Sequence, residues 1–204
     1  IINSNKRIEC RGPDSKRIEN DKTENIHYTF IFNRLSILDL TSEADQPMRS
    51  LDGKSIVLFN GEIYNHMELR AKLESKGVKF RTKRSDTEVV LNGLKEMGDD
   101  FVYELRGQFA IAFFDLEKRN LMLFRDRLGQ KPIFYYLNKE KIIFGSNLLS
   151  IKEKSNESKI SEESLREYLE TGVVQSPNTI YEKIYKLKPA EIINISFKKN
   201  EIKK

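Results

Sequence analysis

The sequence has 204 residues, 38% hydrophobic and 33% charged, which is typical of a globular protein with one large or two small domains. Its 36 basic residues are interleaved with 31 acidic ones, so the net charge of +5 forms no basic stripe for nucleic acid. The longest apolar run, Phe109 to Phe114, is too short to span a membrane. One cysteine excludes an internal disulfide, and with two histidines it is too little for a structural zinc site. We therefore expect a cytoplasmic protein that binds neither nucleic acid nor membranes.

Two strands are predicted early in the chain. Alternating apolar residues at 26–33 predict a half-buried strand. An apolar run at 56–59 predicts a buried strand, which is expected to end at Asn60-Gly61, because an Asn-Gly step favours a tight turn. Such a turn can present one side-chain amide and one backbone N–H in the same direction, which is the arrangement of an oxyanion hole.

Two capping patterns predict the next helices. Asn65 followed by Glu68 starts a helix that runs to about residue 75, and Ser85 followed by Glu88 starts another that ends at Gly98. The other short elements expected here are a strand at 78–82 and a helix around 101–105.

Apolar runs separated by hairpin-length gaps predict antiparallel strands in the second half, at 109–114, 121–124, 133–137 and 142–144. The first run is apolar on both faces, so we expect it to be covered on both sides. Residues 151–160 are polar and predict a surface loop, and Ser161 starts a further capped helix. An α+β fold with two face-to-face antiparallel sheets between helices, an αββα four-layer sandwich, would accommodate this pattern.

Five segments stand in a fixed order: Arg11-Gly12-Pro13-Asp14, Asn33 to Asp39, Asn60 to Asn65, Ser85 to Glu88, and Arg125 to Pro132. Together they resemble the N-terminal glutaminase domain of glutamine-hydrolysing asparagine synthetases, a class II glutamine amidotransferase with an N-terminal nucleophile. The resemblance implies an αββα fold of the N-terminal nucleophile hydrolase type that lacks its first strand. It also implies a truncated amidotransferase domain at 1–197 and, at 198–204, the start of a linker to an ATP-dependent synthetase domain.

The same resemblance implies the site. Asn60 and Gly61 would form the oxyanion hole, and Arg34 would hold the α-carboxylate of glutamine bidentately. Glu62 and Asp86 would face the ammonium group. The backbone beside Arg34 would line the pocket, through Leu35, Ser36, Ile37 and Leu38. We expect no metal or cofactor in this domain; ATP and magnesium would belong to the absent synthetase domain.

Structural alternatives accompany these roles. Asn60 could serve only as a turn former, and Arg34 could be an ordinary surface arginine. Asp86 lies in the first turn of a predicted helix, where the helix dipole already favours an acidic residue. His66 is expected to belong to the helix start, and Arg125 and Asp126 to local structure.

The sequence departs from the family at three places. The family nucleophile, a cysteine at the mature N-terminus, is not in this sequence, so we expect the chain by itself to be inactive. Cys10 is internal, and we interpret it as a small, semi-buried residue. Ser146-Asn147 and Pro189-Ala190 stand where relatives usually show Ser-Glu and Pro-Gly.

Three functions stay open from these residues. The leading one is the glutaminase half of an asparagine synthetase-type enzyme, with glutamine and a C-terminal synthetase domain as partners and a homodimer possible for the full-length enzyme. The second is an amidotransferase for another carboxylate acceptor, such as a sugar acid in surface-polysaccharide synthesis. The third is a non-catalytic glutamine-binding module. Only the missing domain separates the first two.

Overall fold

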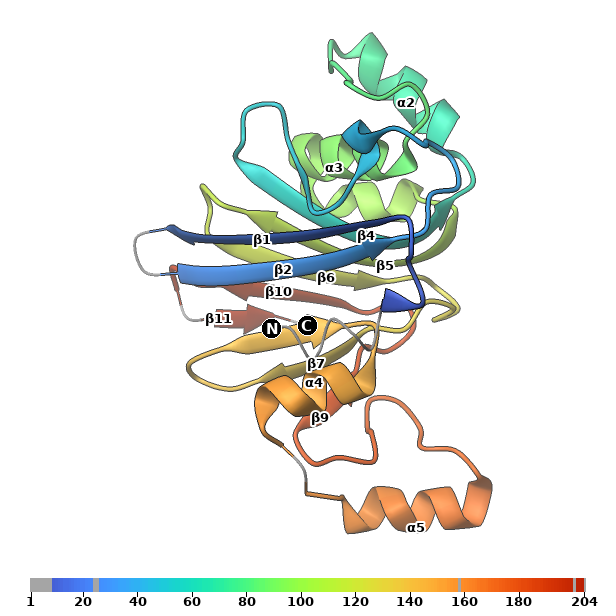
Figure 1. Ribbon diagram of the computed structural model, residues 1–204, viewed down its shortest axis with the longest axis vertical. Coiled ribbons are helices and arrows are strands. Elements are labelled where there is room, and N and C mark those ends of the chain that lie inside the picture. Colours follow the sequence, from blue (N-terminus) through green and yellow to red (C-terminus); the bar gives the residue numbers. More distant parts are fainter. Residues whose placement is uncertain (1–8, 24–25, 158, 200, 204) are drawn as a thin grey trace.

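A six-stranded antiparallel sheet is the centre of the computed structural model, which describes residues 9–23, 26–157, 159–199 and 201–203 (Figure 1). Its strands lie in the order β11-β10-β6-β5-β4-β3. Their bounds are β3 Met48–Arg49, β4 Ser55–Ile63, β5 Gly107–Asp115, β6 Asn120–Arg125, β10 Ile192–Ser196 and β11 Glu201–Lys203.

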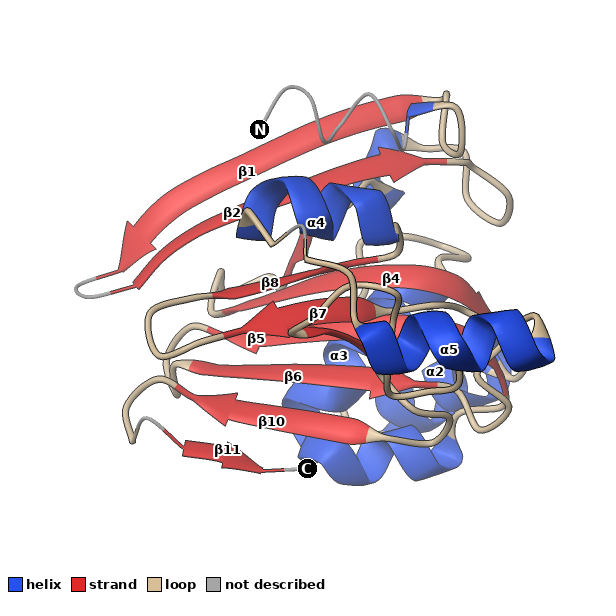
Figure 2. Cartoon of the chain, turned by 90° about the horizontal axis from the view of Figure 1, so that it is seen from below, coloured by secondary structure: helices blue, strands red, loops and turns tan. Residues whose placement is uncertain are grey.

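A second layer of strands covers one face of this sheet, and Figure 2 shows β7 and β8 lying across its front. This layer consists of a two-stranded ribbon and a three-stranded sheet of order β8-β7-β9, both antiparallel. The strands are β1 Ser15–Thr23, β2 Ile26–Arg34, β7 Phe134–Leu137, β8 Ile142–Gly145 and β9 Ile184–Lys186.

Helices enclose the two strand layers. They are α2 His66–Ser75, α3 Asp86–Met97, α4 Leu148–Ser155 and α5 Glu162–Thr171, with short 3₁₀ segments at Ser42–Ala44 and Gly98–Glu104. The α2 and α3 helices pack on one face of the large sheet, and α4 packs on β7 and β8. The order of layers is therefore the predicted αββα sandwich.

Strand β5 supplies side chains to both hydrophobic cores. Phe109, Ile111 and Phe113 join the core beneath α3, whereas the alternate residues at 110, 112 and 114 join the core between the two strand layers. Because successive side chains of a strand point to opposite faces, a strand between two cores must be apolar at every position. This confirms the prediction that the run at 109–114 is covered on both sides.

The predicted turn at Asn60-Gly61 is wrong. Both residues lie inside β4, where Asn60 is opposite Ala110 and Gly61 is opposite Phe109. Glycine is needed at 61 because a Cβ atom there would lie 2.0 Å from the carbonyl oxygen of Gln108. The residue has a φ of +155°, which L side chains rarely adopt. A close approach of two strands, and not a chain reversal, explains this Asn-Gly step.

Two further predicted elements are wrong. Residues 78–82 form no strand, because the backbone N–H groups of Arg81 and Thr82 donate to the buried Glu88 carboxylate instead of to a strand partner. Residues 151–155, predicted as a surface loop, belong to helix α4, whose Ile151 is buried. Asn147 explains this helix, since its side chain accepts the Ser150 N–H at 3.0 Å as an N-cap.

Two single residues differ from their predictions. Asn65 precedes α2 as predicted, but its side chain makes no cap; it binds the Glu104 carbonyl and the Arg106 N–H instead. Cys10, predicted as semi-buried, is exposed.

Three strands near the two ends were not predicted. Among the described strands, the charged β1 pairs only with β2. Strand β11 forms one edge of the large sheet, and β10 lies between β11 and β6. Residues 198–204 therefore include a paired strand, and the domain boundary at 197 stays a prediction.

Candidate functional site

The ends of several strands gather at one end of the molecule. Since β4 and β6 both pair antiparallel with β5, they run in the same direction, and Figure 2 shows β2 running with them. The predicted site segments follow or end these strands: Arg34 ends β2, Ile63 ends β4 and Arg125 ends β6. The fold thus brings three of the predicted segments to the same end of the sandwich.

Arg34 is buried, with 8% of its surface exposed, and holds the chain that follows it. Its Nη1 donates to the Thr41 carbonyl oxygen and to Asp45 Oδ1, each at 2.9 Å. Its Nη2 donates to the Asp39 carbonyl oxygen. The segment from 35 to 45 is therefore wrapped around this guanidinium, and Arg34 is not an ordinary surface arginine.

These contacts leave one edge of the Arg34 guanidinium open. An arginine carries five N–H donors, and the contacts to Thr41, Asp45 and Asp39 use both hydrogens of Nη1 and one of Nη2. Within the described ranges, the Nε hydrogen and the second Nη2 hydrogen have no acceptor. Nε and Nη2 lie along the same edge of the guanidinium, and this edge can bind a carboxylate bidentately.

A cavity of about 510 Å³ lies beside Arg34 and is lined by Asp14, Ser15, Arg34, Ser36, Leu40, Ser42 and Asp45. Of the predicted glutamine-binding residues, Arg34 and Ser36 line it. Leu35 and Ile37 are mostly exposed, Leu38 is half-buried, and none of the predicted residues on β4 or α3 lines this cavity. The Ser36 N–H donates to Asp14 Oδ2 at 2.7 Å, which fixes the cavity wall.

The backbone of β4 has one edge facing β5 and one edge facing away. At its two ends, the Tyr64 N–H donates to the Arg106 carbonyl at 2.8 Å and the Leu116 N–H donates to the Lys54 carbonyl at 2.9 Å. The register between these points is unbroken. Because hydrogen-bonded pairs alternate in an antiparallel ladder, even-numbered residues of β4 bond to β5 and odd-numbered residues point away from it.

On that outer edge, side chains satisfy two of three consecutive N–H groups. The Phe59 N–H donates to Gln46 Oε1 at 2.6 Å, and the Ile63 N–H donates to Asp86 Oδ2 at 3.2 Å. The Gly61 N–H lies between them and has no acceptor in the described part of the chain. A free backbone N–H beside Asn60 is what the predicted oxyanion hole requires.

Asn60 and Glu62 alternate with Gly61 along β4, so both side chains lie on the face that Ile56 presents to the core between the strand layers. Asn60 is half-buried, and among the described residues its side-chain amide has no hydrogen-bond partner. Asp86 is buried at the start of α3, and burial raises the pKa of its carboxyl group, although the Ile63 N–H lowers it.

Asp126 organises the loop after β6. Its carboxylate accepts four backbone N–H groups, from Phe109, Leu128, Gln130 and Lys131, at 2.9 to 3.2 Å. Burial alone would raise the pKa of Asp126, but these donors bring it below its usual value. Arg125 donates to the Lys131 carbonyl at 2.9 Å. Both residues hold the loop, and one donor, Phe109, lies directly opposite Gly61.

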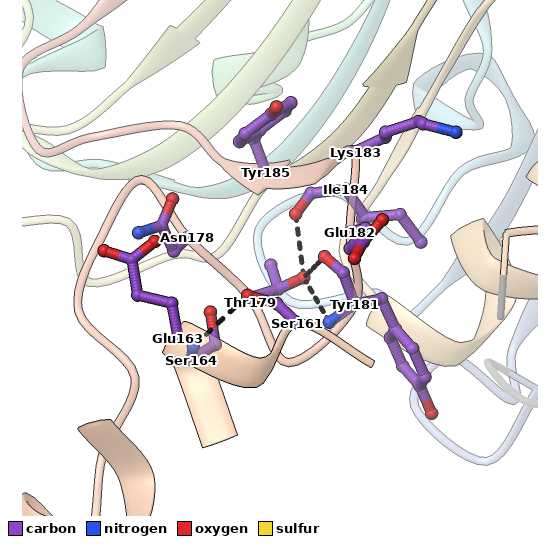
Figure 3. Close-up of a pocket in the computed structure, with 10 residues that line it drawn as sticks. All are labelled: Ser161, Glu163, Ser164, Asn178, Thr179, Tyr181, Glu182, Lys183, Ile184 and Tyr185. Atoms are coloured by element: carbon purple, nitrogen blue, oxygen red, sulfur yellow. Dashed lines mark hydrogen bonds between the residues drawn. The ribbon is translucent and has the colours of Figure 1, made fainter. Parts of the chain in front are cut away.

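A second cavity, of about 300 Å³, lies at the start of α5 (Figure 3). The Thr179 hydroxyl lies within hydrogen-bond distance of the Tyr181 and Ile184 carbonyl oxygens, at 3.1 and 2.7 Å. The Ser161 hydroxyl accepts the Ser164 N–H as the α5 cap. These contacts hold the segment before β9, and none of the predicted site residues lines this cavity.

Two residues at the site gave no signal in the sequence. Asp45 and Gln46 follow a polar stretch and precede Pro47, with no motif of their own, yet both are buried beside predicted site residues. Their role depends on contacts with β2 and β4, which are remote in sequence. Within the described ranges no three His, Cys, Asp or Glu side chains form a metal-binding group, and none of the helices is long and apolar enough to cross a bilayer.

A family model described as a glutamine amidotransferase domain matches residues 1–204. The chain is 34% identical to a Methanocaldococcus jannaschii protein named putative asparagine synthetase (glutamine-hydrolyzing) 2, over 100% of this chain and 42% of that protein. It is 35% identical to asparagine synthetase (glutamine-hydrolyzing) 1 of Bacillus subtilis, over 96% of this chain and 30% of that protein. The chain thus spans less than half the length of these relatives.

The fold is also similar to a solved structure. Glutamine phosphoribosylpyrophosphate amidotransferase from Bacillus subtilis aligns with a TM-score of 0.57 and 19% identity, over 86% of this chain and 34% of that one. At this identity the similarity concerns the fold, and it agrees with the αββα layers described above.

Proposed function

The chain belongs to the family of glutamine amidotransferase domains, and from this we propose that it is the glutamine-hydrolysing part of an asparagine synthetase-type enzyme. It would convert glutamine to glutamate and ammonia. The ammonia would pass to a second, ATP- and magnesium-dependent domain that amidates aspartate. The observation that carries the proposal is the family match over residues 1–204, together with relatives whose names state glutamine hydrolysis.

The reaction would proceed through a thioester. A cysteine thiolate attacks the side-chain amide carbon of glutamine, and the carbonyl oxygen becomes negatively charged in the tetrahedral intermediate. When the carbon–nitrogen bond breaks, the nitrogen takes a proton and leaves as ammonia, and water then hydrolyses the thioester to glutamate. The unpartnered Gly61 N–H and the adjacent Asn60 amide support an oxyanion hole at this position of β4.

Substrate recognition would use the charged groups around these donors. The open edge of Arg34 supports a bidentate grip on the α-carboxylate, and the cavity beside it supports entry of a small amino acid. Asp86 and Glu62 would neutralise the ammonium. One oxygen of Asp86 already accepts the Ile63 N–H, so the ammonium would use the other.

The activity test compares residues 1–204 with a form of the enzyme that contains the nucleophile. An N-terminal cysteine is not part of residues 1–204, so we expect this segment alone to release no ammonia from glutamine. A longer form that begins with the cysteine should release it. If residues 1–204 turn over glutamine and Cys10→Ala abolishes that turnover, the exposed Cys10 is the nucleophile and this proposal is wrong.

Arg34→Lys tests the substrate grip in the full-length enzyme. Lysine keeps the charge but loses the planar fork, so kcat/KM for glutamine should fall by about 30- to 150-fold, which corresponds to ~2–3 kcal/mol. Activity with free ammonia as nitrogen donor should persist, because that route bypasses glutamine. Equal loss on both routes would assign Arg34 to folding alone, and a melting curve of the variant provides the control.

A further inference from the structure

Asp45 is a buried carboxylate fixed on three sides, and it faces the Arg34 guanidinium. Its Oδ1 accepts Arg34 Nη1 and the Ser15 hydroxyl, each at 2.9 Å. Its Oδ2 lies 3.2 Å from Arg17 Nε. Asp45 therefore has a defined position, and its contact with Nη1 holds the Arg34 guanidinium beside the cavity that both residues line.

Gln46, the next residue, is buried and fixes the neighbouring strand. Its side-chain amide makes two bonds to the Phe59 backbone: Oε1 accepts the N–H at 2.6 Å, and Nε2 donates to the carbonyl oxygen at 3.0 Å. Nε2 also lies 3.3 Å from the Thr87 hydroxyl on α3. Gln46 thus takes the place of a strand partner immediately before Asn60 and Gly61.

We propose that Asp45 and Gln46 are positioning residues that together set the spacing between the carboxylate grip and the oxyanion donors. Asp45 orients Arg34, and Gln46 holds β4 at Phe59. Because the two residues are adjacent in the chain, their contacts connect the Arg34 guanidinium to β4 at Phe59. This inference rests on the proposed glutamine hydrolysis.

The arrangement also explains why the Gly61 N–H is open. Strand β3 pairs with β4 only through Met48 and Arg49. Beyond that point Gln46 satisfies Phe59 through its side chain, so the partner backbone does not continue alongside Gly61. A strand in that place would use the Gly61 N–H as a ladder donor and remove it from the site.

Substitutions of Asp45 and Gln46 should change different kinetic constants of the full-length enzyme. Asp45→Asn keeps the shape but weakens the contact with Arg34, so we expect the KM for glutamine to rise about tenfold with kcat within about twofold. Asp45→Glu restores the charge and should recover part of the loss. The matched control is Glu19→Gln, which removes a comparable carboxylate from Arg49, at 2.8 Å, outside the site.

Gln46→Met conserves volume and removes both bonds to Phe59, so kcat should fall about tenfold or more while KM changes little. Its control is Asn92→Leu, which removes another buried amide, on α3, that donates to the Lys79 carbonyl. If Gln46→Met does not fold, Gln46→Asn carries the same test, because its shorter amide cannot reach both Phe59 groups.

The inference is overturned by three outcomes. A lower KM in Asp45→Asn would mean that Asp45 competes with the substrate for Arg34. A purely structural role would be indicated if both variants showed a higher KM, a lower kcat and a lower melting temperature together. Effects no larger than those of the controls would indicate the same. If the unmodified full-length enzyme shows no glutaminase activity at all, the proposed function fails instead, and the two failures are therefore distinguishable.

Discussion

Asp126 is a buried residue that stays charged because the backbone surrounds it with donors. Since its pKa is lowered in the folded state, it stabilises the fold above the pH at which an unfolded aspartate titrates, and that contribution is lost as the pH falls through the folded pKa. Asp126→Asn places an NH₂ group among backbone donors, so we expect a loss of ~2–3 kcal/mol in unfolding free energy near neutral pH.

Denaturant unfolding between neutral and acidic pH checks this. The difference between Asp126→Asn and the unmodified protein should shrink as the pH falls below about 4, where the unfolded carboxylate becomes protonated. Asp99→Asn, at an exposed position, is the control and should change little. A difference that is constant with pH would show that the charge of Asp126 does not matter.

Asn60 lies in a strand, and this changes how its proposed role is tested. Asn60→Asp keeps the shape but places an anion where negative charge develops, and Asn60→Ala removes the donor without a turn to disturb. In the full-length enzyme both should lower kcat by on the order of 10² to 10³ with melting temperatures near that of the unmodified protein. If the melting temperature fell together with kcat, Asn60 would have a structural role.

At the scale of elements, the β4–β5 pair depends on the absence of a side chain at Gly61. A Cβ atom there meets the backbone of Gln108 and Phe109, which cannot move without breaking the ladder. Gly61→Ala should therefore destabilise the protein by ~2–4 kcal/mol, within the range of overpacked and strained sites.

Gly145→Ala on β8 is the matched substitution. Its Cβ atom would approach only a flexible atom of Ile151, at 3.4 Å, and φ does not restrict the position to glycine. Thermal melts of Gly61→Ala and Gly145→Ala test this explanation. Equal decreases in melting temperature would contradict the close approach of β5 to Gly61.

The connection from β9 to β10 contains a residue in an unfavourable backbone conformation. Ala190 has a φ of +57°, in the left-handed region that disfavours a side chain. Its N–H donates to the Asp126 carbonyl at 3.0 Å, so the strained turn is held against the loop at the site.

Across the whole molecule, stability is unevenly distributed. Strand β5 lies between two cores, whereas Ser164 is the only buried residue of α5, the helix at the lower end in Figure 1. Backbone amides of β5 should exchange with solvent at rates close to global unfolding, and those of α5 orders of magnitude faster. Hydrogen-exchange mass spectrometry tests this. Equal protection of α5 and β5 in residues 1–204 would contradict it.

The sequence by itself determined the family, the αββα layers and most strand positions, because apolar periodicity and capping residues act over a few neighbouring positions. The strand at 109–114 and the helices after Ser85 and Ser161 were predicted for this reason. The helix after Asn65 was also predicted, although the Asn65 side chain makes no cap. Strand β1 was missed because its stability comes from pairing with β2 and not from its own polar residues.

Tertiary structure decided what the polar residues do. The Asn60-Gly61 step has the composition of a turn, but β5 and its close backbone contact keep it extended. The sequence predicted Arg34 as a site residue, but only the fold shows that Asp45 binds Nη1 of its guanidinium. Gln46 had no signal at all, because its partner Phe59 is defined by long-range packing, which local sequence patterns do not encode.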